Sequence, residues 1–345
     1  MIGVFLKKML TLMISVVRYY LLFFIIFLFS CHDKLNPYFF YGSAQGSTYT
    51  IKYNTNKKNV ISSSQIDSLF NNIEFSMSNY NYESIISSIN RGEDVELDSL
   101  IEIVLNKSIE VCFETDGMFD VTVSPLVNKW GFGPIVERKN KFNSTNYELV
   151  VGCDKFIIQG DKIIKDANVT IDLNGIAQGF TVDYIANFFL SKGIDNFMIE
   201  VGGEVRCSGD NFNKKWKIAI DKPTNKTREI LFVLSLNDLS LATSGSYRKF
   251  YYNEDSIKIN HTMNPLALEP AFNNLISATI LHKDCMLADA YATACMSFGL
   301  ADSKLFLTKM DIPACLIYTE NRDTMFYFSN NFSSFLHSKP GSAPQ

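Results

Sequence analysis

The sequence predicts an α+β protein with a largely antiparallel sheet and packed helices. Apolar residues follow the helical period in some segments and alternate with polar residues in others. These two kinds of segment mix along the chain without a regular strand–helix–strand rhythm, which argues against a parallel α/β sheet. The 345 residues are 47% hydrophobic and 20% charged, so the chain can bury a large core in one domain or in two closely packed lobes.

The first half of the chain begins with a strand pattern and continues with helices. Tyr49, Ile51 and Tyr53 alternate with polar residues, as in a half-buried strand. Three helices are expected: one along Ile66, Leu69, Phe70, Ile73 and Met77 after a run of Ser, one from Asp98 toward Glu114, and one from Ala177 to Lys192. Gly117 and Gly193 are the stop signals of the second and third helices.

The second half of the chain is rich in strand-like runs. They are Phe197 to Val201, Trp216 to Ile220, Ile230 to Leu236, Ile276 to Leu281, Ala314 to Tyr318 and Met325 to Phe328. A further helix is expected from Leu287 to Leu300.

The charge balance limits the partners of the protein. The formal net charge of -4 provides no general basic surface, so nucleic acid is not an expected partner. If the substrate carries phosphates, their negative charge must be neutralised by something other than a cluster of Lys and Arg side chains.

The N-terminus has the pattern of an export signal. Lys7, Lys8 and Arg18 precede an apolar stretch from Tyr19 to Phe29, which is short for a membrane span. Leu28-Phe29-Ser30-Cys31 resembles a bacterial lipobox, in which the Cys is acylated and becomes the mature N-terminus. An uncleaved anchor is the alternative; in either case the body would lie outside the cytoplasm.

This pattern divides the chain into four parts. We expect a lipoprotein signal peptide over residues 1–30, a tether over residues 31–41, one domain over residues 42–335 and a disordered tail over residues 336–345.

The remaining cysteines are expected to be free buried thiols. They are Cys112, Cys153, Cys207, Cys285, Cys295 and Cys315. Their wide spacing, their mostly apolar surroundings and the lack of a C-x-x-C motif favour this interpretation over disulfides or a zinc site.

Two residues of the helix expected after Leu287 could bind a metal. Asp289 and Thr293 are four residues apart, so a helix places the carboxylate and the hydroxyl on one face. Two hard oxygen ligands suit Mg²⁺, with substrate phosphates and water completing its coordination. Taken on spacing alone, a tightly packed helix of small residues explains the same pattern, and Asp and Thr at this separation are common.

Several turns could approach a ligand closely. In Asp172-Leu173-Asn174-Gly175-Ile176-Ala177-Gln178-Gly179, a β-branched strand is expected to meet a glycine turn and the N-terminus of a helix, an arrangement that attracts phosphate. Gly202-Gly203 and Thr243-Ser244-Gly245 follow strand-like runs. His261 could accept a proton near neutral pH, although a lone His is commonly structural.

These fragments, taken in order, resemble the FAD:protein FMN transferases of the ApbE type. The resemblance begins with Gly42 to Tyr49 and continues with Met77-Ser78-Asn79-Tyr80, Ser84 and Asn90. Thr115 to Gly133 is similar nearly residue for residue to the longest signature of the family. The Asp172 turn, Gly202-Gly203, Thr243 to Gly245, His261 to Pro265 and Ala288 to Thr293 follow in the order of the family.

The resemblance implies a role for each matching position. Asp289 and Thr293 would bind Mg²⁺ with a backbone carbonyl at Gly175 and the pyrophosphate oxygens of FAD. Tyr80 would lie against the flavin or the adenine. The rest of the FAD cleft, between two lobes, would be lined by Gln45, Met118, Phe119, Asp120, Asp172, Gln178 and Met263. Asp120 has an alternative role as a cap at the end of a strand.

Three positions depart from the family pattern. Gln178 stands where many relatives have Lys or Glu, Gln45 stands where Met is usual, and the segment after Asn264-Pro265 lacks Arg-Thr-Gly. The first departure removes a possible cationic contact to phosphate and makes the metal more important. The last puts in doubt the loop that borders the site.

The implied activity is transfer of FMN from FAD to a Thr or Ser hydroxyl of an acceptor protein, with release of AMP. Asp289 would act through the metal, and His261 or a carboxylate would take the hydroxyl proton. The implied acceptors are periplasm-exposed subunits of membrane redox complexes. Two alternatives stay open: a pyrophosphatase that hydrolyses FAD to FMN and AMP, and a lipoprotein that binds flavin without turnover.

Overall fold

The structure divides the chain into a short N-terminal segment and one large body. The computed structural model describes residues 3, 9–19, 35–58, 61–134, 146–224, 229–329 and 331–338. Residues 9–19 are helical, and Pro37–Gln345 form one compact unit distinct from Met1–Asn36. No helix in these ranges is long and apolar enough to cross a bilayer. Cys31 and most of the apolar stretch before it lie outside the described residues.

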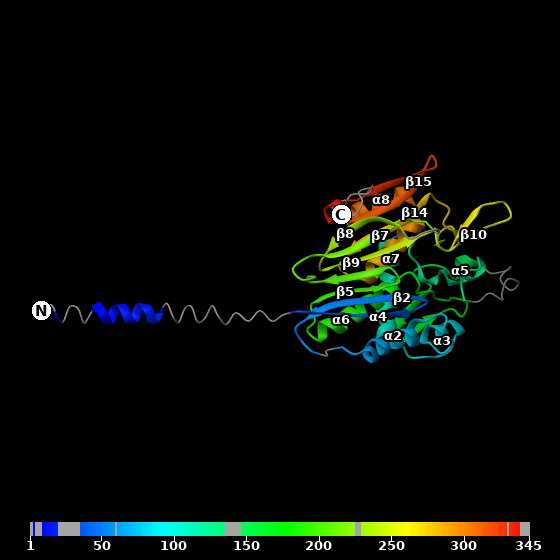
Figure 1. Cartoon of the computed structure of the whole chain (residues 1–345). Helices are drawn as coiled ribbons and strands as arrows, with labels where there is room; N and C mark the ends of the chain where they lie inside the picture. The colour runs from blue at the N-terminus through cyan, green and yellow to red at the C-terminus, as the bar shows by residue number, and fades with distance from the viewer. Residues whose placement is uncertain are drawn as a thin grey trace. The chain divides into compact units, whose positions relative to one another are not determined.

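The body is built on an eight-stranded sheet (Figure 1). Its strands, in spatial order, are β1 (Asn36–Ala44), β2 (Ser47–Thr55), β5 (Asn196–Val201), β6 (Glu204–Ser208), β9 (Leu239–Gly245), β14 (Leu275–His282), β15 (Ala314–Glu320) and β16 (Asp323–Phe328). From β2 to β16 every neighbouring pair is antiparallel. The α+β prediction with a largely antiparallel sheet is confirmed.

Nine further strands form smaller sheets among the described residues. They are β17 (Leu336–Ser338), β8 (Ile230–Leu236) and β7 (Trp216–Asp221) in one sheet, and the pairs β3 (Phe156–Gln159) with β4 (Lys162–Lys165), β10 (Phe250–Tyr252) with β11 (Lys258–Asn260), and β12 (Met263–Asn264) with β13 (Glu269–Pro270). The three-stranded sheet packs through Phe232, Leu234 and Leu236 on the face of the main sheet that carries Val205 and Leu241.

The helices cover the other face of the main sheet. They are α2 (Ser63–Met77), α3 (Ile85–Arg91), α4 (Ser99–Glu114), α6 (Ala177–Ser191), α7 (Cys285–Phe298) and α8 (Leu300–Lys309), whereas α5 (Ser124–Lys129) packs in a separate apolar cluster with Met263. Ala242 of β9 and Ile280 of β14 belong to the core that α4 and α7 share. Because strand residues alternate between faces, neighbouring Leu241 and Ala242 serve two different cores.

Local capping explains where the first helices begin. Ser62 and Gln65 form a reciprocal capping box at the start of α2. Asp98 accepts hydrogen bonds from the backbone N–H groups of Leu100 and Ile101, which fixes the start of α4. The predicted helices at these two places, and the one from Ala177, are confirmed.

Several predicted boundaries are wrong. The helix expected from Leu287 begins at Cys285 and ends at Phe298, and α8 follows directly after Gly299. Asn36–Ala44 form β1, although a tether was expected through residue 41, and Leu336–Ser338 pair with β8 although a disordered tail was expected. In both cases the segment forms the edge strand of its sheet, and its composition alone does not predict this pairing.

The prediction that all six cysteines after Cys31 are free thiols is wrong for two of them. Cys112 at the end of α4 and Cys153 form a disulfide across 41 residues of sequence. Cys207, Cys285, Cys295 and Cys315 are free and buried, as predicted. Spacing alone did not reveal the pair, because only the tertiary fold brings the two chain segments together.

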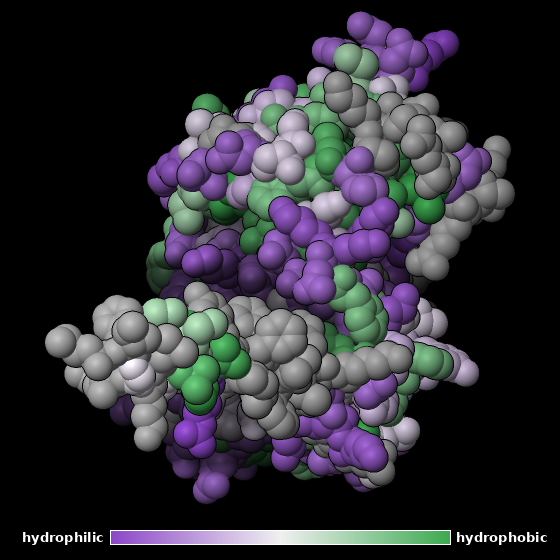
Figure 2. Space-filling model, turned by 60° about the vertical axis from the view of Figure 1, so that its left-hand side comes forward, coloured by the Kyte–Doolittle hydropathy of each residue, from purple (hydrophilic) through white to green (hydrophobic). Residues whose placement is uncertain are grey.

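The surface mixes polar and apolar residues. Figure 2 shows one face, on which hydrophilic residues predominate and hydrophobic residues occur in small groups between them. Such a mixture of polar and apolar residues is usual for the surface of a folded protein.

We expect the double substitution Cys112→Ser with Cys153→Ser to lower the free energy of unfolding by about 2–4 kcal/mol, because it frees a 41-residue loop in the unfolded chain. Guanidinium denaturation with and without reductant measures this. Reductant should destabilise the unchanged protein by a similar amount and leave the double variant unaffected. Equal stability of both proteins under oxidising conditions would contradict the expectation.

Candidate functional site

The α7 helix presents two oxygen-bearing side chains on one face. Asp289, which is 5% exposed, accepts a hydrogen bond at Oδ2 from the backbone N–H of Gly179, at 2.9 Å. Thr293 lies one turn further on, and its Oγ1 is 3.2 Å from Oγ of Ser244 on β9. This face of α7 therefore lies between the start of α6 and the end of β9.

Gly175 completes this group. A Cβ atom at Gly175 would lie 3.1 Å from both Oγ1 and Cγ2 of Thr293 and 3.3 Å from the ring of Phe119. The close approach of this backbone to α7 therefore leaves little room for a side chain. The three residues predicted to bind a metal, Gly175, Asp289 and Thr293, lie together.

The turn that carries Gly175 is fixed by side chains from the α2–α3 region. Asn90 makes two hydrogen bonds with the backbone of Ile171, one to its N–H and one to its C=O. Asp172 Oδ1 accepts from the N–H of Asn174 at 2.9 Å and from Nδ2 of Asn79 at 3.4 Å. The expected strand before this turn is absent, since residues 169–173 are irregular and Asn90 satisfies their backbone in place of a neighbouring strand.

Glu204 is a part of the site that the sequence prediction missed. It is the first residue of β6, is 6% exposed, and has no hydrogen-bond partner at Oε2 among the described residues. Burial raises the pKa of Glu204 well above its usual value, and the nearby Asp289 raises it further. The signal that could have revealed it is a carboxylate directly after Gly202-Gly203, at the start of a strand whose next residue is apolar.

Burial also changes the titration of Asp289. Desolvation raises the pKa of this carboxyl to about 7, and the hydrogen bond from Gly179 opposes the shift. The buried carboxyl groups of Asp289 and Glu204 repel each other when both are ionised. A cation bound at Asp289 would reduce this repulsion and favour the ionised forms.

The residues present fit a hard cation such as Mg²⁺. Such an ion takes oxygen ligands, often one or two carboxylates with phosphate oxygens and water. Over the described ranges, no three His, Cys, Asp or Glu side chains cluster closely enough to hold a metal by themselves. A cation here would therefore depend on Asp289, the Thr293 hydroxyl, a backbone carbonyl and the oxygens of a bound ligand.

Phe119 and Asp120 border the group on a second side. The backbone N–H of Phe119 donates to Oγ1 of Thr115, which fixes the turn after α4. Asp120 Oδ1 accepts from both the N–H and the hydroxyl of Thr122, so it caps the short 3-10 helix Val121–Val123. Its Oδ2 is buried without a hydrogen-bond partner in the described structure, so the contacts present are those of the capping role.

Gln45 and Gln178 both lie near the start of α6. Gln45 has a positive φ of 53° in the β1–β2 turn, and its Nε2 donates to Oγ1 of Thr181 on α6 at 2.7 Å. Gln178 fills the space beside Gly202, where a Cβ atom would lie 1.6 Å from its Nε2. The positive φ of 64° at Gly202 favours glycine at this position.

The other predicted cleft residues differ in their surroundings. Tyr80 is 63% exposed and lies beside Asn174 and Asp172 at the rim. Met118 is half-buried, and its N–H donates to the C=O of Thr115. Met263 is 4% exposed and packs in a separate apolar cluster, while its C=O accepts from Ser297 of α7.

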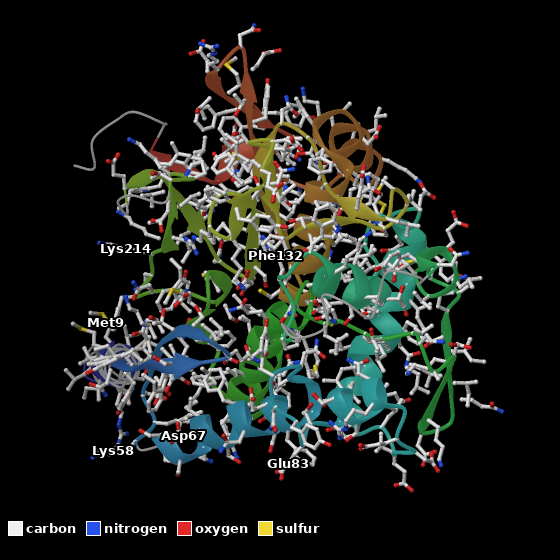
Figure 3. All side chains as sticks on the ribbon, turned by 90° about the vertical axis from the view of Figure 1, so that its right-hand side faces the viewer. Met9, Lys58, Asp67, Glu83, Phe132 and Lys214 are labelled. Atoms are coloured by element: carbon white, nitrogen blue, oxygen red, sulfur yellow. A yellow bond between two sulfur atoms is a disulfide. The ribbon has the colours of Figure 1, made fainter. Side chains whose placement is uncertain are left out.

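His261 lies beside Lys249, which is near Asp172. Its Nδ1 is 3.2 Å from the C=O of Lys249, and its ring packs edge-on against Phe132, labelled near the centre of Figure 3. A carbonyl only accepts, so Nδ1 carries the proton and Nε2 is left as an acceptor. Burial lowers the pKa of His261, so the ring is neutral at pH 7. Its contacts are with Lys249 and Phe132, whereas Asp289 and Thr293 contact α6 and β9.

Comparisons with known proteins agree on one family. Residues 45–316 match the model of the ApbE family. The chain is 32% identical to an FAD:protein FMN transferase of Vibrio cholerae over 90% of this chain and 96% of the relative, and 30% identical to one of Haemophilus influenzae over 90% and 94%. The solved structure of the flavin transferase ApbE from Vibrio cholerae matches 88% of this chain and all of its own, with a TM-score of 0.76 at 32% identity.

The lowered pKa of His261 predicts a pH effect on stability. The unfolded chain binds a proton at this residue below about pH 6.5, whereas the folded protein binds it only at lower pH, so stability falls as the pH drops below 6.5. We expect His261→Gln to reduce this loss. Denaturation at pH 7.5, 6.5 and 5.5 measures it, and parallel pH profiles for the two proteins would contradict the expectation.

Proposed function

The chain belongs to the ApbE family and is an FAD:protein FMN transferase, and we propose that it uses Mg²⁺ to move FMN from FAD to a Thr or Ser hydroxyl of an acceptor protein. The observation that carries the proposal is the meeting of Gly175, Asp289 and Thr293 where the starts of α6 and α7 converge. Mg²⁺ at these residues would neutralise the pyrophosphate and stabilise the charge of the transferring phosphoryl group.

The residues of the chain would position the two reactants. The hydroxyl oxygen of the acceptor forms a bond to the phosphorus on the FMN side, the bond from that phosphorus to the bridging oxygen breaks, and AMP leaves. The N-terminus of α6 would offer backbone N–H groups and a positive dipole end to the phosphates. Tyr80 at the rim would lie against a ring system of FAD.

The acceptor hydroxyl must lose its proton during transfer. Nε2 of His261 is a suitable acceptor because Nδ1 faces a carbonyl and the ring is neutral at pH 7. Glu204 is the carboxylate alternative, since its Oε2 is unpartnered beside Asp289. Hydrolysis of FAD to FMN and AMP would use the same residues with water in place of the acceptor.

The first experiment incubates the protein with FAD, Mg²⁺ and a periplasm-exposed redox subunit that carries a Thr or Ser in a segment of small residues. We expect the acceptor to gain the mass of FMN with one AMP released, and EDTA to block both. AMP and free FMN without acceptor modification would support the hydrolase instead. The absence of AMP would leave a flavin-binding protein.

We expect Asp289→Ala to lower Mg²⁺-dependent transfer by about 100-fold or more, because a carboxylate ligand that stabilises charge in the transition state is lost. Thr293→Val should have a smaller effect, since a hydroxyl is a weaker ligand. Asp284→Asn is the matched control, because this carboxylate is on the same helix start but makes no cap bond. Full activity of Asp289→Ala in a folded protein would contradict the metal assignment.

We propose that the protein is lipid-anchored at Cys31 and faces the periplasm, where it would meet its acceptors. The support is the charged start, the short apolar stretch and the lipobox-like Leu28 to Cys31. A fatty-acid label should be incorporated into the protein and be lost in Cys31→Ser, and globomycin should block processing. Unlabelled protein that keeps its first 30 residues would show an uncleaved anchor instead.

A further inference from the structure

The helices α6 and α7 both begin without a cap of their own. Ile176 and Asp284 occupy the N-cap positions, and neither side chain makes a capping hydrogen bond. The first turn of any helix leaves backbone N–H groups that need partners, and here Gly179 in the first turn of α6 and Met286 in the first turn of α7 are buried. Partners for these groups must come from elsewhere in the fold.

Each helix supplies the missing cap of the other. Oδ2 of Asp289, on α7, accepts from the N–H of Gly179 in the first turn of α6, at 2.9 Å. Oδ2 of Asp183, on α6, accepts from the N–H of Met286 in the first turn of α7, also at 2.9 Å. The two contacts form a reciprocal capping pair between α6 and α7, the helices labelled in Figure 1.

Close packing makes the pair possible. A Cβ atom at Gly179 would lie 2.4 Å from the C=O of Cys285 and 2.7 Å from Cβ of Asp289, so only Gly allows the helix starts to approach this closely. Both carboxylates also lie at the positive end of the neighbouring helix dipole, which stabilises their ionised forms.

Arg206 completes the pair on the side of Asp183. Its Nη1 lies 2.6 Å from Oδ1 of Asp183, so the two oxygens of this carboxylate have separate partners. Arg206 is two residues after Glu204 on β6, so both side chains project from the same face of the strand, toward the helices. The positive charge of the Arg206 guanidinium thus balances the negative charge of Asp183, one of the three carboxylates at this face with Glu204 and Asp289.

We propose that Asp183 is a positioning residue for the metal site, holding the start of α7 so that Asp289 and Thr293 face the pyrophosphate. Asp183 is not proposed as a ligand, because Arg206 and the Met286 N–H occupy its two carboxylate oxygens. It fixes the first turn of α7 at Met286, and Asp289 lies in the turn that follows. The proposal rests on the Mg²⁺ site of the proposed function.

The test measures cation binding directly. Mn²⁺ takes the same oxygen ligands as Mg²⁺ and is detected by electron paramagnetic resonance, with saturating FAD present and an FAD-only blank subtracted. We expect Asp183→Ala to weaken Mn²⁺ binding about tenfold or more, as loss of an outer partner of a ligand commonly does. Asp183→Asn keeps one acceptor for Met286 and should have a smaller effect. If Asp183→Ala does not fold, Asp183→Asn provides the test of Mn²⁺ binding in its place.

Asp98→Ala is the matched control, because Asp98 caps the first turn of α4 in the same way but has no contact with α7 among its hydrogen bonds. The melting temperature should fall in both Ala variants, whereas Mn²⁺ binding should weaken only in Asp183→Ala. Mn²⁺ binding by a folded Asp183→Ala protein within twofold of the unchanged protein would overturn the positioning role.

Hydrogen exchange without metal separates this proposal from the function it rests on. Asp183→Ala should accelerate exchange at Met286, and Asp289→Ala should accelerate exchange at Gly179. Unchanged exchange at Met286 would overturn the capping role. If the unchanged protein binds no Mn²⁺, or Asp289→Ala binds it equally well, the metal site of the proposed function is wrong and the positioning role fails with it, whatever the exchange rates.

Discussion

The hydrogen bond from the Gly179 backbone to Asp289 is the contact on which the site depends. It joins the start of α6 to the second turn of α7, and it requires a glycine because the two helices approach too closely for a side chain. The turn with Gly175 precedes α6 directly, so fixing α6 against α7 also fixes this backbone beside Thr293. A helix start that would otherwise be uncapped thus becomes the means of placing a carboxylate.

Burial of charge is the second constraint. Asp289, Glu204 and Asp183 are all buried at the interface of α6, α7 and β6, where isolated carboxylates are unfavourable. Asp183 has Arg206 and a helix N-terminus as partners, and Asp289 has Gly179, whereas Glu204 Oε2 has none in the described structure. Unpaired negative charge is therefore concentrated where Glu204 meets Asp289. This is why the site suits a cation and a phosphorylated ligand.

Elements with strong local signals were predictable from the sequence. Ser62 and Asp98 cap helices through contacts within three residues, so α2 and α4 could be placed closely. Residues 169–173 have the composition of a strand but bond to Asn90, and Leu336–Ser338 have the composition of a tail but pair with β8. These segments could not be predicted, because their partners lie far away in the sequence.

The sequence by itself determined the α+β class, the helical spacing of Asp289 and Thr293, the glycine turns and the family to which the chain belongs. Tertiary structure alone decided that Cys112 meets Cys153, that Glu204 faces Asp289, and that Asp183 caps α7 from 103 residues away. The physical reason is that spacing within one helix is fixed by its 3.6-residue period, whereas contacts between distant segments depend on how the whole core packs.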